Sequence, residues 1–102
     1  MKDVRFCGRS LDLLRGFPKE AKRDAGYQLD RVQHGLEPTD WKPMPSIGSG
    51  VREIRIMHEG QYRVIYVTKI EDAIYVLHAF QKKTQKTRKQ DIDAAKQALK
   101  QL

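Results

Sequence analysis

Three strand-like segments in succession constrain the fold of this chain more than any other feature. Residues 62–68 read YRVIYVT and are apolar on both faces apart from Arg63, which is typical of a central, buried strand. Residues 51–57 alternate polar and apolar side chains before it, and residues 73–80 form a second apolar run after it. Because only short turns separate the segments, the sequence predicts an antiparallel meander.

The alternation also assigns side chains to the faces of the predicted sheet. Turns are expected at residues 58–61 and at Glu71-Asp72. In the first strand, Glu53 and Arg55 should share the polar face. In the third strand, the alternation places His78 on the face that carries Val76.

Two helices are predicted upstream of the meander. Residues 10–15 fit a short helix, with Ser10 as its N-cap and Gly16 as its end. Beyond Pro18, apolar residues recur every three or four positions and form one helical face. These residues are Ala21, Ala25, Leu29, Val32 and Leu36. Residues 37–50 hold three Pro and two Gly, so a loop is expected there.

A third helix is predicted at the C-terminal end. Thr87 and Gln90 fit the first and last positions of a capping box, and an apolar stripe follows at Ile92, Ala95, Leu99 and Leu102. Residues 2–6 alternate weakly and fit a first strand. The sequence therefore predicts one α+β domain over residues 1–102. Its small twisted antiparallel sheet would have about four strands, with an N-terminal helical hairpin and a C-terminal helix on one face.

Positive charge is concentrated towards the C-terminus. The net charge is +7, and residues 78–102 hold seven basic and two acidic side chains. Residues 81–89, QKKTQKTRK, carry four Lys, one Arg and no acid directly after the third strand. Such a concentration indicates nucleic acid, anionic lipid or an acidic protein as a partner, or else a solvated helix face.

Other classes of protein are disfavoured by composition. No apolar run approaches the roughly 18 residues that a membrane span needs, and the N-terminus lacks a hydrophobic signal region. Cys7 is the only cysteine, which favours a reducing cytoplasm over a disulfide-forming compartment. The three His residues have no paired-ligand spacing, so neither a metal nor a cofactor is expected.

Basic residues of the meander are candidates for an anion site. Arg63 is the one charge in a strand that otherwise looks buried, and such a charge must be paired or face a groove. One interpretation is an ion pair between Arg63 and Glu53 or another carboxylate. The other is an anion site on the sheet that includes Arg55, with Lys82 and Lys83 arriving from the end of the third strand.

Further cations surround the start of the last helix. Lys86, Arg88 and Lys89 flank it, although cations at a helix N-terminus oppose the helix dipole. The same place concentrates backbone N–H donors, which attract phosphate. We expect these three residues, together with Arg52, to contact the phosphates of RNA.

RNA cleavage is a reaction that such residues can perform. The ribose 2′-OH attacks the adjacent phosphate, which requires a proton acceptor, cations for the phosphorane and a proton donor for the 5′-oxygen. Arg and Lys can supply the cations for the phosphorane, while His78, Glu53 or a Lys of lowered pKa could transfer protons. DNA lacks the 2′-OH, so this reaction is restricted to RNA.

Three segments resemble a known family. GVREIRI, YRVIYV and YVLHAFQKKTQKT, in that order after a helical hairpin, resemble the RelE/ParE superfamily of bacterial toxins, and above all the HigB-like, phage-derived branch of type II toxin–antitoxin systems. The resemblance implies an mRNA endonuclease that acts on the ribosome. It also implies a cognate antitoxin, usually a helix-turn-helix protein. Within the toxin–antitoxin pair, only this antitoxin would contact operator DNA.

The resemblance carries over to particular positions. The family's basic residues match Arg55, Arg63 and the pair Lys82-Lys83, with Lys86 close by. RelE has a basic residue where this chain has Glu53. RelE also uses an aromatic residue as its general base, whereas in this chain no Tyr or Phe follows Phe80. His78 and then Glu53 are the candidates for that base. The alternatives are a ParE-like inhibitor of DNA gyrase, which would not need this basic site, and a non-catalytic RNA-binding module.

Overall fold

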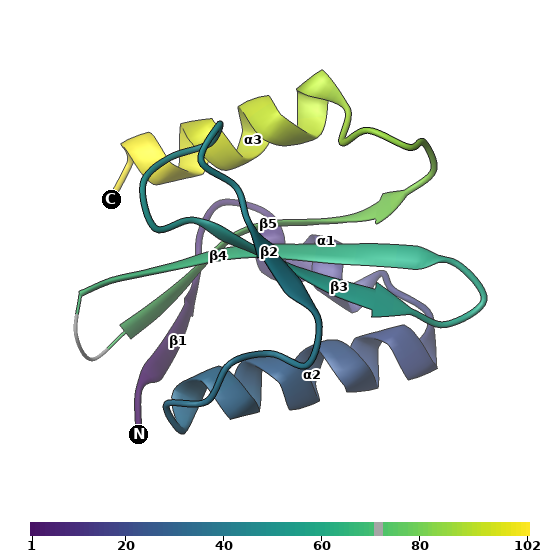
Figure 1. The fold of residues 1–102 in the computed structure, drawn as a ribbon, viewed down its shortest axis with the longest axis horizontal. Helices are drawn as coiled ribbons and strands as arrows, with labels where there is room; N and C mark the ends of the chain where they lie inside the picture. Colours follow the sequence, from purple (N-terminus) through teal and green to yellow (C-terminus); the bar gives the residue numbers. More distant parts are fainter. Residues whose placement is uncertain (71–72) are drawn as a thin grey trace.

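The computed structural model describes residues 1–70 and 73–102 (Figure 1). The predicted turn at Glu71-Asp72 lies outside the described residues. The elements in chain order are β1 (Asp3–Phe6), α1 (Ser10–Arg15), α2 (Lys19–Gln33), β2 (Trp41–Pro43), β3 (Arg52–Met57), β4 (Gln61–Ile70), β5 (Ala73–Lys82) and α3 (Lys89–Lys100). The α+β class, the N-terminal helical hairpin, the meander and the C-terminal helix are confirmed.

The sheet has five strands in the order β1-β5-β4-β3-β2 and is mixed. The meander β3-β4-β5 and the pair β2-β3 are antiparallel, whereas β1 pairs with β5 in parallel, from Asp3 opposite Ala73 onwards. Two details differ from the prediction: the sheet is not purely antiparallel, and residues 41–43 form strand β2 within the segment predicted as loop. Pro43 fits there because β2 is an edge strand, where a missing N–H costs no ladder bond.

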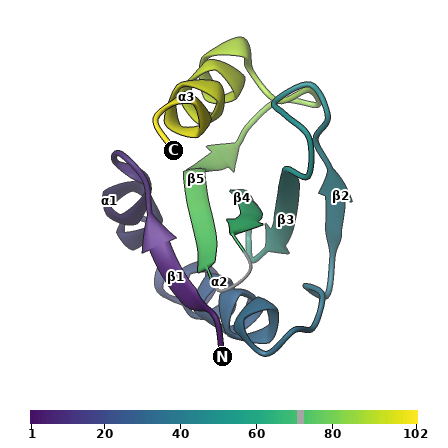
Figure 2. The same cartoon turned by 90° about the vertical axis from the view of Figure 1, so that its left-hand side faces the viewer.

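Helices cover both faces of the sheet, with α2 on one side and α3 on the other (Figures 1 and 2). The core beneath α1 and α2 includes Leu14, Ala21, Ala25, Leu29, Val32, Ile54, Ile56, Val64 and Val76. The core beneath α3 includes Met44, Ile47, Ile65, Val67, Tyr75, Leu77, Ala95 and Ala98. The prediction that all helices lie on one face was wrong, because β4 is apolar on both faces and each face requires its own cover.

A bulge in β5 changes the direction of its side chains. Ile65 pairs with His78 whereas Tyr66 pairs with Val76, so Leu77 is an extra residue in the ladder. As a result His78 lies on the α3 face, where it contacts Asp91, and not on the face of Val76 as the alternation predicted. The extra residue interrupts the two-residue period on which that prediction rested.

The start of α3 also differs from the prediction. The helix begins at Lys89, its N-cap is Arg88, and no side chain caps it. The hydroxyl of Thr87 instead lies 3.5 Å from Oε2 of Glu53 on β3, to which it donates. The predicted capping box is therefore wrong, and the chain before α3 is tied to the sheet.

Candidate nucleic-acid interface

Four cations gather on the α3 face of the sheet, one from each of the strands β2 to β5. They are Lys42, Arg55, Arg63 and Lys82, and we call them the cationic cluster. Arg55 lies directly opposite Arg63 in the β3-β4 ladder. Because like charges that face each other across strands destabilise a sheet, this arrangement requires a compensating negative charge.

Glu53 lies at the base of the cationic cluster and is fully buried. Its Oε1 is 3.9 Å from Nζ of Lys42 and 3.4 Å from Nε of Arg63. The predicted ion pair between Arg63 and Glu53 is thus confirmed. The Arg63–Glu53 contact lacks hydrogen-bond geometry, so the attraction between them is that of an ion pair alone.

Arg63 is held in place by the strand that carries it. Its side chain is 6 % exposed; Nη1 donates to the carbonyl of Tyr62 at 3.0 Å, and Nη2 donates to Oε1 of Gln61 at 2.8 Å. These bonds satisfy Nη1 and Nη2 of a charge that would be costly to bury alone, while Nε faces Glu53 without a hydrogen bond. Arg63 is therefore a fixed source of positive potential beneath the more accessible cations.

Arg55 is the accessible arginine of the cationic cluster. Its side chain is 41 % exposed, and its Nε donates to Oδ1 of Asp40 at 3.1 Å. The backbone N–H of Arg55 also donates to the carbonyl of Asp40 at 2.9 Å, which fixes the segment before β2 against β3. An exposed pair of this kind is weak, so a phosphate can replace Asp40 at small cost.

The cations of the cluster influence each other's ionisation. Burial lowers the pKa of Lys82, and Arg63, Lys42 and Arg55 lower it further, while Glu53 acts in the opposite direction. Burial also lowers the pKa of Arg63, an effect that Glu53 opposes and Arg55 reinforces. An arginine stays protonated regardless, so of these two residues with lowered pKa only Lys82 is suited to releasing a proton.

The loop after β5 adds cations next to the cluster. Lys82 and Lys83 line a hollow of about 570 Å³ together with Gln61 and the loop residues that follow. Lys86 is exposed in this loop, where its carbonyl accepts a hydrogen bond from the hydroxyl of Thr84 at 2.6 Å. Lys89 is exposed and lies 3.7 Å from Asp93.

Arg52 does not join the cationic cluster. It lies on the α2 face, with its guanidinium 4.1 Å from the centre of the Trp41 ring and 3.4 Å from Oε1 of Glu37. The structure thus separates Arg52 from the cationic cluster and places it on the opposite face of the sheet. Strand alternation separates it from Glu53 and Arg55.

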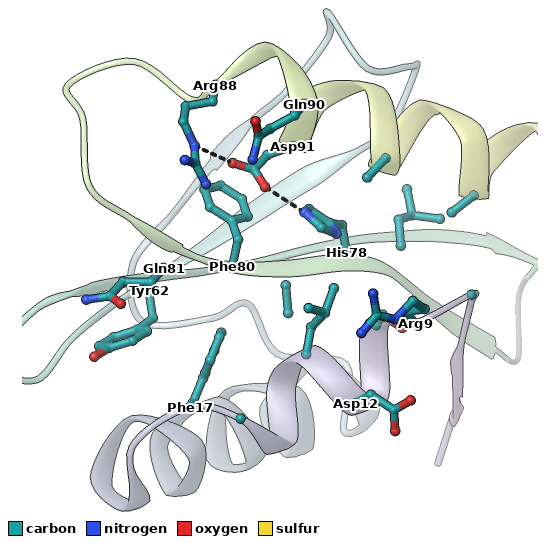
Figure 3. Close-up of a pocket in the computed structure, with 18 of the residues that line it drawn as sticks. Arg9, Asp12, Phe17, Tyr62, His78, Phe80, Gln81, Arg88, Gln90 and Asp91 are labelled. Atoms are coloured by element: carbon teal, nitrogen blue, oxygen red, sulfur yellow. Dashed lines mark hydrogen bonds and ion pairs between the residues drawn. The ribbon is translucent and has the colours of Figure 1, made fainter.

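His78 and Arg88 meet a different partner, Asp91 of α3 (Figure 3). Nε2 of His78 lies 2.9 Å from Oδ1 of Asp91, and Nε of Arg88 lies 3.4 Å from Oδ2. The His78 ring stacks on Phe80, with the ring centres 5.5 Å apart. The structure therefore brings His78 together with α3, and Arg88 faces Asp91 and not the cationic cluster.

The sequence prediction missed Lys42 and Asp40. Both belong to the segment predicted as loop, and β2 brings Lys42 opposite Glu53. The available signal was that Lys42 is the one charged residue in residues 41–50. In the part of the chain that the structure describes, no group of three or more His, Cys, Asp or Glu residues is arranged to hold a metal ion.

The fold and the cationic cluster define a small RelE-like α+β domain with a basic sheet surface. A family model described as phage-derived protein Gp49-like (DUF891) matches residues 12–100. The chain belongs to this family, which is RelE-like and associated with toxin–antitoxin systems. A search of curated proteins found no match to the chain. Over residues 1–70 and 73–102, every helix is too short or too polar to cross a lipid bilayer.

Proposed function

We propose that this protein is the toxin of a type II toxin–antitoxin system and that it cleaves mRNA on the ribosome, as its resemblance to HigB-like toxins implies. The observation that carries the proposal is the cationic cluster around buried Glu53. A gyrase inhibitor or a partner-binding module has no need to hold two arginines opposite each other on a sheet. A site for a pentacoordinate phosphate does, because that species carries extra negative charge.

In the proposed reaction, the cations of the cluster bind and stabilise the scissile phosphate. Arg55 and Lys42, each 41 % exposed, contact the non-bridging oxygens of the scissile phosphate, and Arg63 stabilises the same charge from below. The 2′-oxygen bonds to phosphorus while the bond from phosphorus to the 5′-oxygen breaks. The products are a 2′,3′-cyclic phosphate and a free 5′-OH.

Proton transfer is assigned to the lysines at the end of β5. Lys82, whose pKa is lowered, accepts the proton of the 2′-OH in its neutral form. Lys83 lines the same hollow as Lys82 and donates a proton to the leaving 5′-oxygen. Glu53 is enclosed by Lys42, Arg63 and Thr87, so its role is to hold the cations and not to meet substrate.

The test is induction of the protein in a bacterium, followed by mapping of transcript 5′ ends by primer extension. We expect growth arrest with cuts inside translated regions that leave 5′-OH ends. Growth arrest with intact messages and gyrase-linked DNA breaks would contradict the proposal and favour the ParE-like alternative. RNA binding without cuts would favour the non-catalytic module.

A further inference from the structure

The hollow beside Lys82 carries a polar side chain that the proposed chemistry does not use. Its volume is about 570 Å³, and its lining residues are Gln61, Lys82, Lys83, Thr84 and Gln85. Gln61 is the first residue of β4 and pairs with Lys82 in the ladder between β4 and β5. Sites for small ligands typically measure about 300–1,000 Å³, so the hollow has room for one nucleotide.

The orientation of the Gln61 amide is dictated by Arg63. Oε1 of Gln61 accepts a hydrogen bond from Nη2 of Arg63 at 2.8 Å. Because a guanidinium has donors and no acceptor, the amide must face it with the oxygen and cannot be turned around. Arg63 is 6 % exposed and also donates to the carbonyl of Tyr62, so the amide rests against a fixed group. Gln61 itself is exposed, which leaves the two N–H donors of its Nε2 available to the hollow.

The polar groups that the sheet holds around the hollow are all donors. Lys82 and Lys83 contribute ammonium groups, which have no acceptor, and Gln61 contributes Nε2. Thr84 and Gln85 belong to the exposed loop after β5. Among the described residues, no carboxylate lines the hollow. The sheet side of the hollow therefore favours a ligand edge that offers acceptors.

The proposed reaction brings a particular nucleotide to the hollow. Lys83 donates a proton to the leaving 5′-oxygen, and this oxygen belongs to the nucleotide on the 3′ side of the cut. Since Lys82 and Lys83 take part in proton transfer, Gln61 is the donor that remains for the base. Guanine presents two adjacent acceptors, N7 and O6, whereas adenine presents N7 beside the N6 amino donor.

We propose that the hollow is a nucleobase site in which Nε2 of Gln61 selects guanine over adenine on the 3′ side of the cut. The position of this base relative to the cut rests on the proposed function. A free glutamine binds adenine through both ends of its amide, by donating to N7 and accepting from N6. The bond from Arg63 occupies that acceptor, so the preference for adenine is lost and the donors of Gln61 match guanine.

The test compares the cleavage rates of two ribosome-bound messages that differ only in this base. The parent should cleave the guanine message at least about tenfold faster than the adenine message, as one good base contact allows. In Gln61→Glu one carboxylate oxygen can still accept from Arg63, and the other accepts where Nε2 donated. This variant should reverse the preference, while Gln61→Met should abolish it. The ratio of the two rates cancels any general loss of activity.

A matched control makes the same chemical change elsewhere in the hollow. Gln85→Glu adds the same charge to the lining at a residue that does not contact Arg63. Its ratio of guanine to adenine cleavage should stay within about twofold of the parent ratio, because the base contact of Gln61 is intact. Circular dichroism checks that every variant is folded. If Gln61→Glu is not folded, Gln61→Met carries the test.

Binding without cleavage separates the base site from the proposed function. The probes are uracil oligonucleotides with one guanine or one adenine, each preceded by a 2′-deoxy nucleotide that cannot supply the attacking hydroxyl. By fluorescence anisotropy, the parent should bind the guanine probe at least about tenfold more tightly. Selective binding with no cleavage of any message would refute the enzyme and leave the base site standing.

Four results would overturn the base site. These are equal cleavage of the two messages by the parent, an unchanged ratio in Gln61→Glu and Gln61→Met, the same change of ratio in Gln85→Glu, and equal or absent binding of the two probes. Cleavage of mRNA together with any of them would leave the proposed function in place and remove Gln61 from its specificity.

Discussion

Arg63 and Glu53 contact each other away from solvent, so substitution of either residue is expected to lower stability as well as to change the site. Their side chains are 6 % and 0 % exposed. Removing one partner of a buried ion pair typically costs about 3–5 kcal/mol of stability. A loss of toxicity in Arg63→Ala therefore does not identify its role, and the accessible residues Arg55, Lys42 and Lys82 give cleaner tests.

The pKa of Lys82 should respond with opposite signs to two neighbouring substitutions. Glu53 raises the pKa of Lys82 and Lys42 lowers it, so Glu53→Gln should move the titration of Lys82 to lower pH and Lys42→Met should move it to higher pH. NMR of the labelled lysine side-chain nitrogens measures both shifts. Glu37 lies on the opposite face near Arg52, so Glu37→Gln is the control and should leave the titration of Lys82 unchanged. Shifts of the same sign would contradict the geometry of the cluster.

The lowered pKa of Lys82 also has a consequence for stability. A base whose folded pKa lies below its unfolded value binds fewer protons when folded, so its contribution to stability rises with pH. The rise begins near the folded pKa and is complete near the ordinary lysine value of about 10.4. Below this pH window, where Lys82 is charged in both the folded and the unfolded state, its charge lowers the stability of the fold, as expected of a residue kept for function.

Alternation predicted the location of some site residues and not of others. Arg55 and Glu53 were placed correctly because β3 is a regular strand with one apolar face. Arg52 belongs to the same strand but faces α2, as the same alternation requires. Lys42 was missed because its position depends on the register of β2 with β3, which no local pattern in residues 41–43 encodes.

Among the elements, β5 and its bulge determine where His78 lies. Residues 73–80 are buried throughout, so a one-residue shift leaves no mark in the hydrophobic pattern. The parallel pairing of β1 is likewise invisible in residues 3–6, which are too few and too weakly alternating to specify a neighbour. The elements themselves were predictable, whereas the register that positions their side chains depends on tertiary packing.

The contact between His78 and Asp91 should fasten α3 to β5. A double-mutant cycle of His78→Ala and Asp91→Ala, measured by urea denaturation, is expected to give a coupling energy of about 1–3 kcal/mol. His34 and Asp30 form the control pair, because they are exposed and 3.6 Å apart at the C-terminal end of α2, where His34 is the C-cap. Their coupling should stay below about 0.5 kcal/mol. Additive effects at His78 and Asp91 would show that the helix is held by its apolar face alone.

At the scale of the whole molecule, helices on both faces of the sheet explain how so small a domain keeps an accessible cationic surface. Both faces of β4 are buried, so the cores under α2 and α3 can hold the sheet while strands β2 to β5 each contribute one cation to the cluster. The class of fold was predictable because the meander and the two amphipathic helices are strong local patterns. The distribution of helices over two faces was not, since either arrangement satisfies the same periodicity.

Binding of single-stranded RNA should depend steeply on salt. If the accessible cations Lys42, Arg55 and Lys82 each meet a phosphate, a plot of log affinity against log salt has a slope of about −2, at roughly 0.7 per contact. Lys82→Met should reduce the size of this slope by roughly 0.7. Lys22→Met, which removes an exposed charge from α2, should leave it unchanged. A flat response in the parent protein would contradict phosphate binding by the cluster.

The central claim is that the cationic cluster on the α3 face of the sheet cleaves RNA. Two arginines of β3, one on each face of the sheet, test it most directly. Arg55 and Arg52 are 41 % and 37 % exposed, each contacts one carboxylate, and they lie on opposite faces. The measurement is the rate of cleavage of ribosome-bound mRNA by the purified variants. We predict that Arg55→Ala lowers the rate at least about 100-fold, as loss of a transition-state contact does, while Arg52→Ala stays close to the parent. Equal losses, or a larger loss in Arg52→Ala, would contradict the account.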